Sequence, residues 1–68
     1  MKRLTNSEAN ELLKKGKILR QMGPDNITLR KLWKDCYHFV NEQQKVSTLM
    51  DGVTTVRVLT YHSYYFEG

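Results

Sequence analysis

A chain of 68 residues with one cysteine, Cys36, cannot close a disulfide on itself. Without such cross-links, a domain this small must be held together by its own thin core or by a partner. The single thiol favours a reducing compartment, and we expect a cytoplasmic protein. Such a chain buries only about 60% of the surface that its unfolded form exposes, which favours a function carried on the outer surface over a large enclosed active site.

The composition fits one globular domain over residues 1–68. Apolar residues make up 40% of the chain and charged residues 26%, values typical of folded domains rather than disordered segments. The N-terminus lacks the apolar run of a signal peptide, and no stretch approaches the ~18 apolar residues that span a bilayer. We therefore expect neither export nor membrane association.

The first helix is predicted over about residues 6–15. Thr5 and Glu8 have the spacing of a capping box, in which each side chain satisfies a backbone N–H of the first turn. Ala9, Leu12 and Leu13 fall on one face, and Gly16 suits the position after a helix because glycine adopts positive φ without strain. The segment 17–22 then has the apolar centre and the glycine boundaries of a short strand.

A second helix is predicted from about Thr28 to Glu42. Its apolar residues repeat at the intervals of an amphipathic helix, with charged residues on the opposite side. The apolar stripe consists of Leu29, Leu32, Trp33, Cys36 and Val40.

The remaining residues predict a β-hairpin. Asp51-Gly52 separates two β-favouring runs, 45–50 and 53–66, and is typical of a type I′ turn. The whole chain therefore predicts a single α+β domain in the order helix, strand, helix, hairpin, with two helices packed on a small antiparallel sheet. A terminal strand with aromatic residues on both faces would lie at a sheet edge, where it could pair with a second copy of the chain.

Charge is unevenly placed along the sequence. Residues 1–34 contain nine lysines and arginines against three acidic residues, a net charge of +6, and residues 35–68 sum to −2. A basic half favours an anionic partner, either nucleic acid or an acidic protein surface. Arg30, Lys31 and Lys34 would share the exposed side of the second helix.

The sequence contains no strong motif for metal binding, catalysis or phosphate binding. Cys36, His38 and His62 are the only soft or imidazole ligands; on a helix the first two point to different sides, whereas on a strand they would share a face. No nucleophile elbow, catalytic-cysteine signature or glycine-rich phosphate loop is present. We therefore predict no metal, no cofactor and no enzymatic activity.

The C-terminal residues 61–66 hold four of the seven aromatic residues. Tyrosine, tryptophan and arginine are the residues most often found at interaction hot spots. Tyr61, Tyr64 and Tyr65, together with the three basic residues of the second helix, form the predicted partner-binding surface.

The segment 7–20, SEANELLKKGKILR, resembles the opening of small phage and prophage proteins that begin with a helix, a glycine and a basic strand reading roughly EALELLKKGKKVRR. Asn10 departs from the pattern, and the tryptophan that commonly follows the basic strand is missing. The resemblance implies an accessory protein of a mobile element, of a kind that often binds and blocks a host component, including defence systems.

These observations favour a non-enzymatic protein that docks on a larger host protein or nucleoprotein and modulates or inhibits it. The alternative is a small basic DNA-binding regulator of winged-helix-like outline, in which the second helix enters the major groove and the hairpin contacts the backbone.

Overall fold

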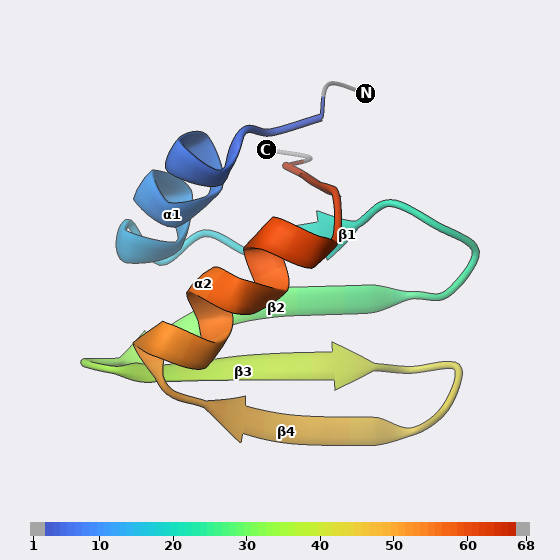
Figure 1. Ribbon diagram of the computed structural model, residues 1–68. Helices are drawn as coiled ribbons and strands as arrows, with labels where there is room; N and C mark the ends of the chain where they lie inside the picture. The colour runs from blue at the N-terminus through green and yellow to red at the C-terminus, as the bar shows by residue number, and fades with distance from the viewer. Residues whose placement is uncertain (1–2, 67–68) are drawn as a thin grey trace.

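The computed structural model describes residues 3–66, which form a five-stranded antiparallel sheet with two helices on one face (Figure 1). The α+β class predicted from the sequence is confirmed. In chain order the elements are α1 (Asn6–Lys14), β1 (Leu19–Gln21), β2 (Ile27–Trp33), β3 (Cys36–Asn41), β4 (Val46–Met50), α2 (Gly52–Tyr61) and β5 (Tyr64–Tyr65).

Helix α1 forms where the local sequence predicts it. The Thr5 hydroxyl accepts a hydrogen bond from the Glu8 backbone N–H at 3.1 Å, and the Glu8 carboxylate accepts one from the Thr5 N–H at 3.0 Å. Gly16 follows the helix with φ of 81°. Ala9 and Leu13 are buried against the sheet, so both the capping box and the apolar face are confirmed.

The predicted helix over residues 28–42 is wrong, because this segment forms the hairpin β2–β3. The turn between the strands contains Asp35 at φ of 54°, a left-handed conformation that aspartate tolerates. The strands alternate between a buried and an outer face, with Leu29 paired to Phe39 on the buried face and Arg30 paired to His38 on the outer face. The helical spacing of the apolar residues is therefore coincidental.

The predicted hairpin over residues 45–66 is wrong beyond its first strand. Strand β4 is present, but Asp51 caps a helix instead of entering a turn: its carboxylate accepts a hydrogen bond from the Thr54 N–H at 2.7 Å. That bond from the Thr54 backbone lowers the pKa of Asp51 below its ordinary value of 3.8. Residues 52–61 form α2, and only Tyr64–Tyr65 remain extended as β5.

The sheet has the strand order β4-β3-β2-β1-β5, so β5 closes one side and β4 the other. Both helices pack over the same face, and Figure 1 shows α2 lying across the strands. The buried cluster between the layers comprises Ala9, Leu13, Leu19, Leu29, Tyr37, Leu59 and Tyr64.

Helix α2 is tied to the β2–β3 turn at its first residue. The Asp35 carboxylate accepts a hydrogen bond of 2.8 Å from the Gly52 N–H. A Cβ at position 52 would lie 2.8 Å from that same carboxylate oxygen, so glycine permits the close approach. Asp35 and Asp51 together place two carboxylates at the N-terminus of α2, where negative charge is favoured by the helix dipole.

Candidate interaction surface

Among residues 3–66, no helix packs on the face of the sheet opposite α1 and α2; we call it the open face. Paired residues of an antiparallel ladder point to the same side, so the register assigns its members directly. None of them is buried, in contrast to the core residues on the other side. The open face consists of Arg20, Thr28, Arg30, Trp33, Cys36, His38, Val40, Ser47, Leu49 and Tyr65.

Two rows of side chains cross the open face. The first row follows the pairs that link Tyr65, Arg20, Thr28, Val40 and Ser47. Directly paired side chains lie about 5 Å apart at Cβ, and neighbouring rows on the same face lie about 7 Å apart.

The second row contains Arg30, His38 and Leu49. The His38 imidazole Nε2 and the Ser47 hydroxyl lie 2.6 Å apart, which links this row to the first. Arg30 is exposed and Leu49 is 60% exposed, so a cation and an aliphatic side chain flank the imidazole in solvent.

Trp33 reaches the open face through an irregularity in β2. Lys31 pairs with Tyr37, and Trp33 then pairs with Cys36, so two positions along β2 match one along β3. The extra residue, Leu32, is a β-bulge, which changes the side to which the following residue points. As a result Trp33 lies beside Cys36 with 64% of its surface exposed.

The open face carries cations and rings but no carboxylate among its ten side chains. Arg20 donates a hydrogen bond of 2.5 Å to the Asn26 side-chain oxygen, and the Asn26 amide donates one of 2.6 Å to Glu42. These bonds hold Arg20 at one end of the face. A partner that meets Arg30, Trp33 and Leu49 would therefore be one with negative charge and some apolar surface.

The structure divides the predicted partner-binding residues among five places: the open face, the helix side of the sheet, the β2–β3 turn, the end of α2 and the core. Arg30 and Tyr65 lie on the open face. Lys31 lies on the helix side, with its ammonium 6.0 Å from the centre of the Tyr37 ring, and Lys34 lies in the β2–β3 turn. The predicted single surface is therefore wrong, because it depends on residues 28–42 being helical.

The two remaining tyrosines differ from one another. Tyr61, at the end of α2, is 79% exposed, whereas Tyr64 is 2% exposed and belongs to the core. The Tyr64 hydroxyl donates a hydrogen bond of 3.1 Å to the Gln21 side chain. Tyr64 is therefore part of the core and is not exposed on the surface of the described chain.

Burial raises the pKa of Tyr64 from 10.0 to about 12. Because the folded state holds this proton more tightly than the unfolded state, its stabilising contribution is complete below pH 10 and is lost as the pH rises toward 12. We expect the midpoint of urea unfolding to fall over this range. In the Tyr64→Phe variant the urea midpoint should fall less between pH 10 and pH 12. The same fall in the variant as in the unaltered protein would contradict the raised pKa of Tyr64.

Cys36 and His38 share the open face, as residues two apart on a strand must. His62, however, follows α2 on the other layer of the molecule. Among residues 3–66, no group of three or more histidine, cysteine, aspartate or glutamate side chains is placed to hold a metal ion. Cys36 and His38 are therefore neighbours on the open face.

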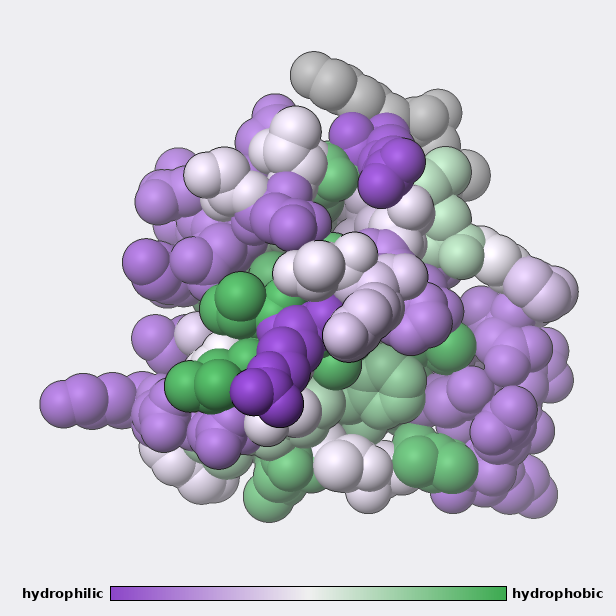
Figure 2. Space-filling view, in the orientation of Figure 1, coloured by the Kyte–Doolittle hydropathy of each residue, from purple (hydrophilic) through white to green (hydrophobic). Residues whose placement is uncertain are grey.

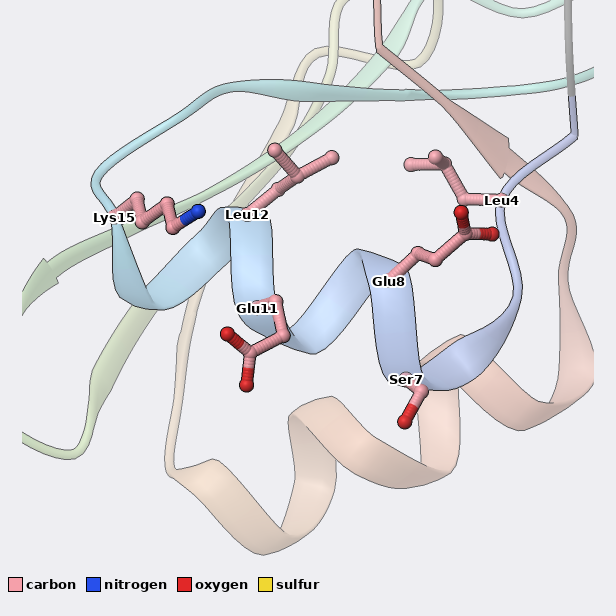
Figure 3. Close-up of a pocket in the computed structure, with 6 residues that line it drawn as sticks. All are labelled: Leu4, Ser7, Glu8, Glu11, Leu12 and Lys15. Carbon is pink, nitrogen blue, oxygen red and sulfur yellow. The ribbon is translucent and has the colours of Figure 1, made fainter.

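A shallow groove runs along α1 (Figure 3). Leu4 and Leu12 lie on the same side of the helix, and Figure 3 shows Ser7 and Glu11 pointing away from them. The Glu8 carboxylate at its margin is used in the capping box. The groove thus lies along the apolar edge of the helix, and its lining residues do not form a catalytic or metal-binding cluster.

The residues that sequence reasoning missed are Trp33, Leu49, His38 and Arg20. For His38 the signal was local, because residues 36, 38 and 40 share one face if the segment is a strand. The places of Arg20, Trp33 and Leu49 depend on strand pairing and on the bulge at Leu32, which have no local signal.

Comparisons with protein-family models, curated proteins and solved structures found no match to this chain. In the part of the chain that the structure describes, neither helix has the length and apolar character needed to cross a bilayer.

Proposed function

We propose that this chain is a non-enzymatic binding protein that docks its open face on a larger, acidic protein surface. The observation that carries the proposal is the exposure of Trp33, an indole left 64% in solvent on the same sheet face as the exposed Arg30. Tryptophan is highly buried on average, and an indole this exposed beside an arginine is typical of an interaction hot spot.

The composition of the open face suits a protein partner. Tryptophan and arginine dominate hot spots because they bury a large area and combine apolar contact with directed hydrogen bonds. Leu49 adds an exposed aliphatic contact. A rigid sheet also presents these side chains at fixed spacing, which lowers the conformational entropy lost on binding.

The resemblance of residues 7–20 to phage and prophage proteins supports an accessory role in a mobile element. On this proposal the partner is a host protein or nucleoprotein, defence systems included, and binding modulates or inhibits it. The same surface would act in the cytoplasm.

Nucleic acid is the second candidate, and Arg30 and Trp33 favour its single-stranded form. Bases stack on exposed aromatic rings, and arginine contacts phosphate. Duplex binding of the winged-helix kind needs a recognition helix, which was predicted over residues 28–42. That segment forms the hairpin β2–β3 instead. Binding to single strands would weaken steeply with salt.

The test is the recovery of cross-linked partners from a host lysate with tagged protein, with and without nuclease, identified by mass spectrometry. We expect Trp33→Ser with Arg30→Ala to reduce recovery of a specific partner at least tenfold, in line with the loss of two hot-spot side chains. Tyr61→Ser is the matched control, since Tyr61 is exposed but lies on α2.

Equal recovery by the folded double variant and the control would overturn the proposal. Loss of the partner on nuclease treatment, combined with salt-sensitive binding of a single-stranded oligonucleotide, would replace it with the second candidate.

A further inference from the structure

Strand β4 is an edge strand without the usual protection. One side of it pairs with β3, and in the described sheet no strand follows on the other side. Its five residues, VSTLM, contain no charge and no proline, and the first four are exposed. Natural proteins commonly protect such edges with lysine, proline or a bulge, because the unpaired N–H and C=O groups accept another strand.

The opposite edge of the sheet is closed. Strand β5 has only two residues, and the carbonyl of Tyr64 accepts a hydrogen bond of 2.8 Å from the Leu4 N–H. The N-terminal segment thus covers β5. The predicted pairing of two copies through a long C-terminal strand loses its basis, because residues 52–61 are helical and the remaining strand is short and covered.

We propose that β4 pairs with β4 of a second copy in antiparallel register about Thr48. This register places Val46 opposite Met50 of the second copy and Ser47 opposite Leu49. It also places Lys45, just before the strand, next to Asp51 of the second copy, just after it. Both ends of the pairing are therefore matched in charge, and the uncharged residues meet one another between them.

This register buries side chains that are otherwise exposed. Val46 is 41% exposed on the helix side and Leu49 is 60% exposed on the open face. Figure 2 shows green and near-white side chains along the lower rim over β4, where a second copy would lie. Because each copy has one accessible edge, pairing is two-fold symmetric and ends at a dimer with a continuous ten-stranded sheet.

The dimer does not depend on what the open face binds. It would join two open faces side by side, with Leu49 of each copy near the junction. A partner with two binding sites could then contact the open faces of both copies at once, and its apparent affinity would rise through avidity.

The test uses charge at the two-fold axis. We expect sedimentation velocity to give twice the 8.0 kDa mass of one chain for the unaltered protein. Thr48→Lys and Thr48→Glu each place like charges opposite one another, so each should weaken dimerisation about fivefold or more. An equimolar mixture of the two variants, one with a mass-shifting tag, should restore dimers as mixed pairs.

Thr60→Lys is the matched control, because Thr60 is exposed on α2, and it should remain dimeric. Circular dichroism confirms that each variant is folded. A monomeric unaltered protein up to millimolar concentration would overturn the proposal, and so would an unchanged dimer dissociation constant in both Thr48 variants or assemblies larger than a dimer.

Discussion

Replacing Leu29 with alanine is expected to leave much of the protein unfolded at room temperature. Leu29 is fully buried at the centre of the sheet and belongs to the cluster between the sheet and both helices. Truncating a buried leucine costs about 2–5 kcal/mol, and a domain of this size has about 3–5 kcal/mol of stability to lose. Urea unfolding followed by far-ultraviolet circular dichroism measures the loss.

Trp33→Ser is the informative comparison, since a helix over residues 28–42 would bury Leu29 and Trp33 together. In the sheet Trp33 is mostly exposed, and its replacement should change the free energy of unfolding by about 0.5 kcal/mol or less. A large loss of stability in Trp33→Ser, or a small one in Leu29→Ala, would contradict the arrangement of β2.

The contrast between α1 and β2 shows which parts of the fold a sequence can predict. The cap of α1 consists of residues three apart, so its signal is local and complete within the segment. The pairing of β2 with β3 depends instead on a turn at Asp35 and on contacts between distant residues. The apolar set from Leu29 to Val40 fits a helical stripe equally well, and only burial in the tertiary structure decides between the two.

Helix α2 is the clearest case of tertiary structure overriding local propensity. Its sequence, GVTTVRVLTY, is rich in β-branched residues that favour strands. Burial of Thr55 and Leu59, four residues apart, together with the Asp51 cap, stabilises the helical form. Asp51 is both a turn former before glycine and a helix cap, so the dipeptide Asp51-Gly52 did not distinguish the two outcomes.

The residues of the open face were only partly predictable from the sequence, because their placement also depends on the tertiary structure. Of the six residues predicted to bind a partner, only Arg30 and Tyr65 lie on the open face, with Arg30 exposed and Tyr65 half-buried. Trp33 could not be found by composition, since an isolated tryptophan is most often read as a core residue. The bulge at Leu32, a feature of the strand pairing, is what places Trp33 on the open face.

Replacing Tyr64 with serine is expected to unfold the protein as Leu29→Ala does. The ring is fully buried in the core, and its hydroxyl donates a hydrogen bond to the Gln21 side chain. Removing a buried aromatic side chain costs about 3–5 kcal/mol, which is close to the whole stability of the domain. Thermal unfolding followed by circular dichroism checks this directly.

Tyr61→Ser provides the control, because Tyr61 is 79% exposed and its loss should leave the unfolding temperature nearly unchanged. If Tyr64→Ser folded as well as Tyr61→Ser does, the core would not be organised around this ring. A partner lost in the Tyr64 variant therefore reports unfolding, whereas a partner lost in a folded Trp33 variant reports contact. Binding experiments on the C-terminal aromatic residues must compare these three positions before any tyrosine is assigned to an interface.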